Sequence, residues 1–136
     1  MIQNTLTFRV RYAETDKMGI AHHSSYVLWF EMARIELMRS IGLSYAQFEK
    51  DGYLMPVLEI NIQYKKAVTF DQLLNITASI NQKPKAKLRY EYQISDDDEI
   101  VCEGLSLHGY MNLQNKAIKP PKAFLNKINE YFKEAI

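Results

Sequence analysis

Residues 12–34 of the chain have the sequence YAETDKMGIAHHSSYVLWFEMAR, and this stretch decides the fold. Asp16 comes just before a turn at Gly19, and His22 and His23 follow where a helical pattern is about to begin. The unpaired backbone N–H groups and the positive dipole end of a helix start favour negative charge. The stretch therefore delivers a carboxylate and imidazoles to a place suited to acyl-transfer chemistry at a carbonyl group.

A long helix is predicted directly after this turn. From Ser25 onward, apolar residues recur at steps of three and four, which is typical of an amphipathic helix. These apolar positions are Val27, Phe30, Ala33, Leu37 and Ile41. Ser24 or Ser25 is the expected N-cap, and Gly42 is expected to end the helix. A short second helix is expected between Ser44, which begins a capping box, and Gly52.

The rest of the chain is predicted to be mostly strand. Alternation of apolar and polar residues marks strands at 5–12, 58–65, 74–81, 87–94 and 100–113. In the last of these, the residues expected to be in phase are Val101, Leu105, Leu107 and Met111. An amphipathic helix over residues 122–133 closes the chain. Alternation on every strand favours an antiparallel sheet with one buried face, which the long helix would cover. The predicted class is therefore α+β, with a curved antiparallel sheet wrapped around a long central helix and a C-terminal helix.

The opening stretch also resembles a known family, the acyl-CoA thioesterases of the 4-hydroxybenzoyl-CoA thioesterase family, which have the hotdog fold. In their motif an aromatic residue precedes an acid turn, a glycine and a histidine that opens the central helix. The residues in register with it are Tyr12, Thr15, Asp16, Gly19, Ile20, His23, Tyr26, Glu31, Ala33 and Arg34. Where the family commonly has asparagine, two residues after the histidine, this chain has Ser25. The resemblance implies a homodimer or homotetramer with active sites at subunit interfaces.

The resemblance also implies roles for three residues. Asp16 matches the catalytic carboxylate, although a turn aspartate can also be purely structural. It would either activate water as a general base or attack the thioester carbonyl to give a mixed anhydride. His23 would bind the thioester oxygen through its backbone N–H or orient water with its imidazole. Tyr12 would assist by a hydrogen bond to the carboxylate or to water, with packing at a strand end as its alternative role.

Coenzyme A needs cationic partners for its phosphate groups, and lysines suit phosphate at an exposed rim. The candidate contacts to substrate and CoA are Gly19, Tyr26, Lys65, Lys83, Lys85, Lys87 and Arg89. The lysines around the Pro84 turn have an alternative role, as solvated charges that protect a sheet edge. Packing in the first helical turn is the alternative role of Tyr26.

Composition narrows the possible functions further. The 136 residues form one domain, residues 1–136, and a net charge of +1 argues against general nucleic-acid or membrane-surface binding. No apolar run of about 18 residues is present, so no membrane span is expected. The lone Cys102 fits a reducing cytoplasm and a buried apolar position. Neither a metal-ligand spacing nor a glycine-rich phosphate loop is present in the sequence.

The sequence thus predicts a cytoplasmic acyl-CoA thioesterase that hydrolyses an acyl-CoA to the free acid and CoA. Coenzyme A is part of the substrate, and no metal or redox cofactor is expected. Three alternatives stay open: a thioesterase for acyl groups on acyl-carrier protein, a non-catalytic acyl-thioester-binding protein of the same fold, and a hydratase of that fold.

Overall fold

The structure is a computed structural model that describes residues 1–132 of the chain. In chain order the elements are β1 (Ile2–Arg9), the 3₁₀ turn η1 (Tyr12–Glu14), α1 (His23–Ser40), α2 (Tyr45–Lys50), β2 (Tyr53–Leu54), β3 (Val57–Tyr64), β4 (Leu73–Ile80), β5 (Leu88–Asp96), β6 (Glu99–His108), β7 (Met111–Asn112), α3 (Lys122–Asn129) and the 3₁₀ turn η2 (Glu130–Phe132). The predicted closing helix is confirmed through residue 132, and Lys133 lies outside the described residues.

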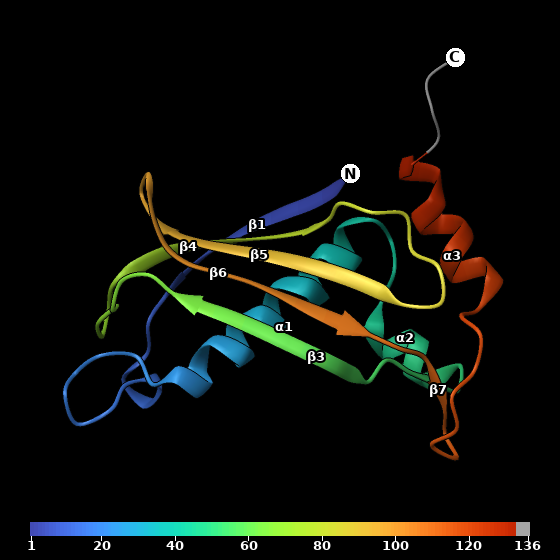
Figure 1. The fold of residues 1–136 in the computed structure, drawn as a ribbon, viewed down its shortest axis with the longest axis horizontal. Helices are drawn as coiled ribbons and strands as arrows, with labels where there is room; N and C mark the ends of the chain where they lie inside the picture. Colours follow the sequence, from blue (N-terminus) through green and yellow to red (C-terminus); the bar gives the residue numbers. More distant parts are fainter. Residues whose placement is uncertain (133–136) are drawn as a thin grey trace.

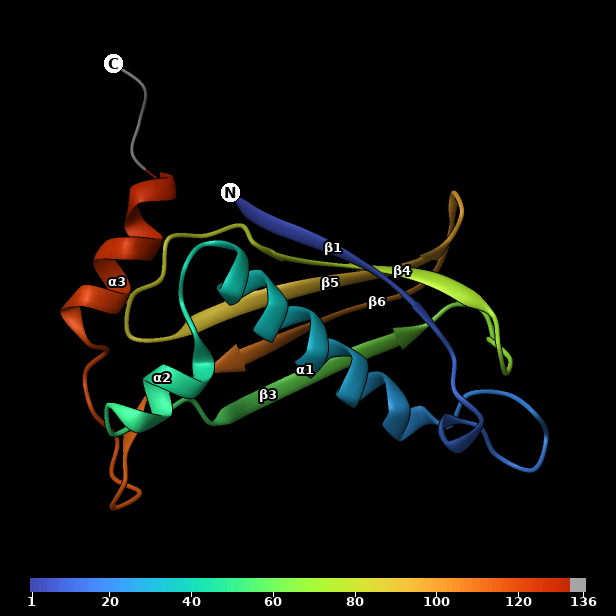
Figure 2. The same cartoon turned by 180° about the vertical axis from the view of Figure 1, so that it is seen from behind.

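Five strands form one antiparallel sheet in the order β1-β4-β5-β6-β3, and β2 pairs with β7 in a separate small ribbon. Helix α1 runs diagonally across one face of the curved sheet, while α2 and α3 lie at the end where α1 finishes (Figures 1 and 2). This arrangement confirms the predicted α+β class, with the sheet wrapped around a long central helix. As expected, α1 ends just before Gly42, which has a φ of 84°.

The core lies between α1 and the sheet. Phe30 and Leu37 of α1 are fully buried against Leu74, Ile76 and Ile94 of the central strands. The ring of Phe30 stacks on that of Tyr92, with centroids 4.1 Å apart. Gly104 on β6 makes this close approach possible, because a Cβ there would lie 2.6 Å from Phe30 and 2.5 Å from the Asn61 carbonyl oxygen.

The prediction of which side chains of the last long strand face the core is correct for Val101 and wrong for the residues after it. Cys102, Ser106 and His108 face the core, whereas Leu105 and Leu107 are only partly buried. The pairing of β5 with β6 shifts register between Ile94 and Ser95, and Val101 and Cys102 are both fully buried. A one-residue shift of this kind turns every later side chain to the opposite face. The predicted strand also divides at Gly109, so Met111 lies in β7.

Polar groups therefore enter the core from β6. The Ser106 hydroxyl lies 2.6 Å from the Tyr92 hydroxyl and 2.8 Å from Nε2 of His108, so each of these groups is paired. Burial, with the nearby Arg34 charge, lowers the pKa of His108 to about 4, which keeps the ring neutral. Burial raises the pKa of the Cys102 thiol to about 12, which fits the predicted inert, apolar role.

The alternation in the sequence predicts a half-buried β3, but the strand is exposed over most of its length. Within residues 1–132 it pairs only with β6, so its other edge faces solvent. Val57, Leu58 and Ile60 are 47%, 52% and 37% exposed. The strand keeps apolar side chains on an open edge, where unpaired backbone groups can accept another strand.

Candidate active site

Asp16 lies in a small closed turn between η1 and α1. The Asp16 N–H donates to the Ile20 carbonyl at 2.9 Å, and the Gly19 N–H donates to the Asp16 carbonyl at 3.0 Å. Gly19 has a φ of 79°, a conformation that favours glycine. Antiparallel bridges from Thr15 to Ala21 and from Ile20 to Thr69 fix the turn to itself and to the segment after β3. The predicted glycine turn is thus confirmed.

The Asp16 side chain is half-buried, and one of its two carboxylate oxygens is hydrogen-bonded. Its Oδ1 accepts a hydrogen bond of 2.8 Å from the Met18 N–H. No donor among residues 1–132 engages its other carboxylate oxygen. One oxygen is therefore held while the other is available to a water molecule or a substrate.

The N-cap of helix α1 lies two or three residues before the predicted caps Ser24 and Ser25. Its N-cap is His22, whose Nδ1 accepts from the Ser24 N–H at 3.2 Å and lies 2.7 Å from the Ser24 hydroxyl. The prediction of a serine cap is therefore wrong, because the imidazole reaches the amide that a serine hydroxyl would otherwise satisfy. Ser25 is buried instead, and its hydroxyl donates to the Glu14 carbonyl at 2.8 Å.

His23 is the first residue of α1, and its imidazole is exposed beside that of His22, with ring centroids 4.1 Å apart. In the part of the chain that the structure describes, no acceptor binds the His23 backbone N–H. The first N–H groups of a helix have no partner within the helix, so this amide is a free donor at the positive end of the α1 dipole.

The end of β3 meets the start of α1. The Tyr64 hydroxyl donates to the His23 carbonyl at 3.2 Å, and the Tyr64 ring packs edge-on against Tyr26, with centroids 4.8 Å apart. Burial raises the pKa of Tyr26 to about 12 and also raises the pKa of Tyr64, so both phenols stay protonated at neutral pH. Lys65 and Lys66 follow directly, and the N–H groups of both donate to the Val101 carbonyl.

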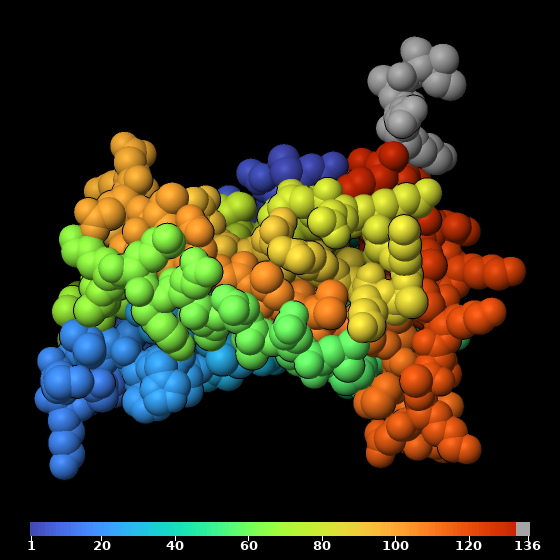
Figure 3. Space-filling view, viewed as in Figure 1, coloured from blue at the N-terminus to red at the C-terminus, as the bar shows by residue number. Residues whose placement is uncertain are grey.

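These segments enclose an open cleft of about 330 Å³. Its lining consists of Asp16, Ile20, Ala21, His22, His23, Tyr26, Tyr64, Lys65, Lys66 and Ala67. In Figure 3 the blue segment that carries Asp16 lies against the green segment at the end of β3. Of the predicted site residues, the cleft brings together Asp16, His23, Tyr26 and Lys65. Tyr64 also lines the cleft but is not predicted from the sequence, because its alternation with polar neighbours is that of any strand residue.

The remaining candidates lie away from the cleft lining. Gly19 shapes the Asp16 turn without lining the cleft. Tyr12 is 77% exposed in η1, and its ring packs edge-on against Phe70, with centroids 5.5 Å apart. The exposed side chains of Lys83, Lys85 and Lys87 lie on the β4–β5 connection with Arg89 just beyond, at the opposite end of the sheet from Asp16 (Figure 1). Within one chain they are therefore remote from the turn.

A larger apolar hollow of about 520 Å³ lies between the end of α1, α2 and α3, with Phe48 and Phe124 in its wall. Its one carboxylate, Asp51, is exposed and accepts from the Gln47 amide at 2.9 Å. Within residues 1–132 no three His, Cys, Asp or Glu side chains are placed to hold a metal ion. No helix in the same range is long and apolar enough to cross a membrane.

Comparison with known proteins agrees with the fold and with the opening motif. The sequence profile of the thioesterase-like superfamily matches residues 10–128. The chain is 37% identical over 117 residues to YneP of Bacillus subtilis, a candidate acyl-CoA thioesterase, with 85% of each chain covered. It is 28% identical over 97 residues to acyl-CoA thioesterase YbgC of Haemophilus influenzae, covering 69% of this chain and 71% of YbgC. A crystal structure of a DHNA-CoA thioesterase from Staphylococcus aureus superposes with a TM-score of 0.89 at 30% identity, covering 97% of this chain and 90% of the other. The resemblance found in the sequence is thereby confirmed, and the chain belongs to the thioesterase-like superfamily.

Proposed function

We propose that the protein is a thioester hydrolase that converts an acyl-CoA to the free carboxylic acid and CoA. One observation carries this proposal: a half-buried carboxylate with one free oxygen shares a cleft with the start of α1. The names of the similar proteins from B. subtilis, H. influenzae and S. aureus support the same reaction class. In this scheme Asp16 supplies the base or nucleophile and the start of α1 supplies the donor to the thioester oxygen, so it uses no metal or redox cofactor, and CoA is part of the substrate. We place the reaction in the cytoplasm, whose reducing conditions suit the free Cys102 thiol.

The start of α1 is the proposed site for the thioester oxygen. The His23 backbone N–H is a free donor among the described residues, and the helix dipole adds to it. When a nucleophile attacks the carbonyl carbon, negative charge develops on that oxygen, and a donor placed there stabilises it. One donor of this kind is typically worth about 10²–10³ in turnover.

Asp16 brings about attack on the thioester carbonyl carbon by one of two routes. As a general base it takes a proton from water while the water oxygen bonds to the carbonyl carbon, and collapse of the intermediate expels the CoA thiolate. As a nucleophile its free oxygen attacks the same carbon, the thiolate leaves, and water hydrolyses the resulting mixed anhydride. Tyr64 holds the His23 carbonyl in both routes. Tyr12, which packs on Phe70 outside the cleft lining, would reach the Asp16 carboxylate or its water only by turning its ring toward the cleft.

The substrate class is testable directly. Thiol release should be measured from short-chain, long-chain and aromatic acyl-CoAs at neutral pH. We expect release from at least one of these classes. Release only from acyl groups on acyl-carrier protein would replace CoA as the substrate. Saturable binding of an acyl-CoA without hydrolysis would make the protein a non-catalytic acyl-thioester-binding member of the fold.

The lysines at the end of β3 are the proposed contacts for the CoA phosphates. Lys66 already pairs with Glu99 at 2.7 Å, which raises the Lys66 pKa, whereas Lys65 is 3.9 Å from Glu103. We expect Lys65→Glu to raise the KM for an acyl-CoA about fivefold, since an exposed charge pair is worth about 1 kcal/mol. The kcat should stay within twofold, because Lys65 does not act on the carbonyl.

The matched control for this prediction is Lys50→Glu, which makes the same charge change at an exposed position on α2. An unchanged KM in Lys65→Glu would make Lys65 a solvated surface residue. The same assay applied to Lys85→Glu with Lys87→Glu tests the turn at the far end of the sheet.

We propose that two chains pair through β3. This strand has an open edge in the described part of the chain and carries exposed Leu58 and Ile60. Antiparallel pairing of β3 with the β3 of a second chain would continue the sheet and cover those side chains. It would also bring the far end of the partner chain, with its Lys83–Lys87 turn, to the end of the sheet that holds Asp16. In such a shared site, the Lys83–Lys87 turn, which is remote from Asp16 within one chain, would lie near the Asp16 of the partner chain.

Charge at this edge should break the pairing. Leu58→Lys with Ile60→Lys places like charges close together across the two-fold axis, so we expect a monomer in light scattering where the wild type gives a dimer or a tetramer. Activity should fall with the assembly if the site is shared. Leu113→Lys, at a position 58% exposed just after β7 and outside the β3 edge, is the control. A double variant that keeps the wild-type mass would exclude this edge as the interface.

A further inference from the structure

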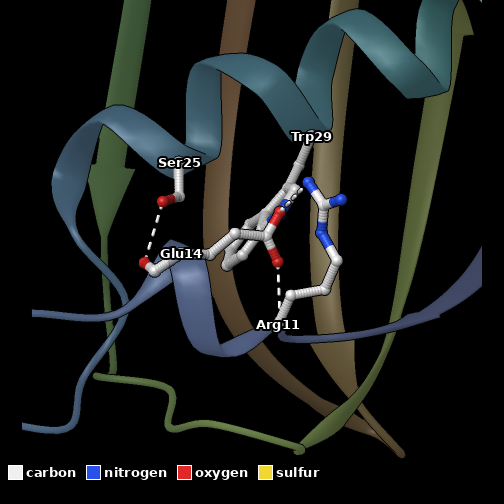
Figure 4. Close-up of polar contacts among 4 residues, drawn as sticks. All are labelled: Arg11, Glu14, Ser25 and Trp29. Carbon is white, nitrogen blue, oxygen red and sulfur yellow. Dashed lines mark hydrogen bonds and ion pairs between the residues drawn. The ribbon is translucent and has the colours of Figure 1, made fainter.

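Glu14 is the one carboxylate that is buried among residues 1–132, at 6% exposure. Its Oε1 accepts from the Arg11 N–H at 2.7 Å. Its Oε2 accepts from the Trp29 indole N–H at 2.8 Å and from the Arg11 guanidinium at 3.2 Å (Figure 4). Removing a carboxylate from water is costly, and here hydrogen bonds from three donors offset that cost. Nothing in the reaction proposed above uses this group.

The backbone of Glu14 is held as firmly as its side chain. The Glu14 carbonyl accepts from the His22 N–H at 2.8 Å and from the Ser25 hydroxyl at 2.8 Å. One residue thus binds the cap, the first turn and the second turn of α1, through His22, Ser25 and Trp29. We call these five contacts, including the two from Arg11, the Glu14 anchor.

The Asp16 turn lies between the two ends of this anchor. The hydrogen bond from His22 to Glu14 closes residues 15–21 into a loop whose base is fixed on α1. Inside the loop, the Asp16 N–H bonds to Ile20, and Thr15 bridges to Ala21. Because the loop is tied internally, a shift of its base moves the Asp16 carboxylate as a unit relative to the start of the helix.

We propose that Glu14 is a positioning residue. It holds the Asp16 carboxylate at the distance from the His23 amide that the hydrolysis reaction requires. This inference rests on the proposed hydrolase function. Burial alone would raise the pKa of Glu14, but hydrogen bonds from the Arg11 backbone and Trp29, with the Arg11 guanidinium, hold that pKa below its ordinary value. The carboxylate is therefore ionised at neutral pH, and the anchor weakens only as pH falls through this lowered pKa.

The Glu14→Gln variant is the sharpest test. The amide keeps the shape of the side chain but replaces one acceptor oxygen with an NH₂ group, which would face the Arg11 N–H or the Trp29 indole N–H. We expect kcat to fall about 10- to 100-fold with KM within threefold, since a 1 Å displacement of a reacting group can cost about 10²-fold. Ser25→Ala, which removes only the bond to the Glu14 carbonyl, should give a smaller fall in kcat in the same direction.

Glu36→Gln is the matched control, because Glu36 also pairs with an arginine three residues away, Arg39, but at the surface of α1. Its kcat should equal that of the wild type. A folded Glu14→Gln variant with wild-type kcat would overturn the positioning role. If Glu14→Gln does not fold, Ser25→Ala becomes the test. An unchanged kcat in Ser25→Ala would likewise overturn the positioning role of Glu14.

A second readout does not depend on activity. Trp29 is the only tryptophan, so its indole N–H gives a single NMR cross-peak. In Glu14→Gln this peak should shift, and backbone amides of residues 16–23 should exchange with solvent at least tenfold faster than in Glu36→Gln. If the wild type hydrolyses no thioester but amide exchange is faster in Glu14→Gln than in Glu36→Gln, the proposed hydrolase function is wrong. The role of Glu14 in holding the Asp16 turn is then still supported. Unchanged exchange in an inactive protein would reject the anchor as well.

Discussion

The substitution Asp16→Asn should lower the kcat for acyl-CoA hydrolysis by about 10²- to 10⁴-fold, the range that a positioned acid–base group contributes. The amide has nearly the same shape and can still accept from the Met18 N–H at Oδ1. It cannot take a proton from water, and it is a poor nucleophile, so both proposed routes lose their first step. Since Asp16 is only half-buried, circular dichroism and the melting temperature should match those of the wild type.

The control for this measurement is Asp51→Asn on α2, which makes the same chemical change in an exposed residue away from the cleft. Thiol release by the two variants should be followed with the acyl-CoA that the wild type hydrolyses fastest. A folded Asp16→Asn enzyme with near-normal kcat would leave Asp16 with the role of a turn residue. The chemistry would then have to come from another group in the cleft, and His23 would be the next residue to change.

The substitution with the largest expected effect on stability is Gly104→Ala. A Cβ at this position would lie 2.6 Å from the Phe30 ring and 2.5 Å from the Asn61 carbonyl oxygen, closer than real Cβ atoms approach. The carbonyl is backbone, and Phe30 is stacked against Tyr92, so neither neighbour moves easily. Overpacking of a filled core costs about 1–3 kcal/mol. The melting temperature should therefore fall by roughly 5–10 °C in calorimetry at equal protein concentration.

Gly109→Ala provides the comparison, because the nearest atom to its Cβ would be a flexible Leu58 methyl carbon at 3.3 Å. Its melting temperature should change far less. Combining Gly104→Ala with Phe30→Leu should also cost less than the sum of the two single changes, since the smaller side chain removes one of the clashes. Equal stability of Gly104→Ala and the wild type would show that α1 can move away from β6.

Local sequence patterns were sufficient for most of the fold. The steps of three and four between Phe30, Ala33 and Leu37 depend only on the helix itself, and these residues do face the sheet. Strand β4 was also predicted well, because both of its neighbours are strands of the same sheet. The Asp16 turn was predicted from short-range chemistry: an acid, a glycine with positive φ and a helix start.

What the sequence did not predict depends on distant partners. The phase of β6 changes at a register shift against β5, and no local pattern in β6 encodes that shift. The exposure of β3 follows from its place at the edge of the sheet rather than from its composition. Tyr64 joins the cleft only because β3 ends beside α1, and Glu14 becomes a buried, hydrogen-bonded carboxylate only once Trp29 lies against it.

The cleft is assembled from segments that lie far apart in the chain. Tyr64 and His23 are 41 residues apart in the chain, and their hydrogen bond requires β3 to lie in place beside β6. The bonds within the Asp16 turn span only a few residues, so they close at little entropic cost, whereas distant contacts carry the entropy of closing a long loop. A chain newly released from the ribosome can thus close the local hydrogen bonds of the Asp16 turn well before it forms the cleft. During folding, the first hydrolysis of thioester should therefore be detected only when β3 has paired with β6 and the sheet is complete.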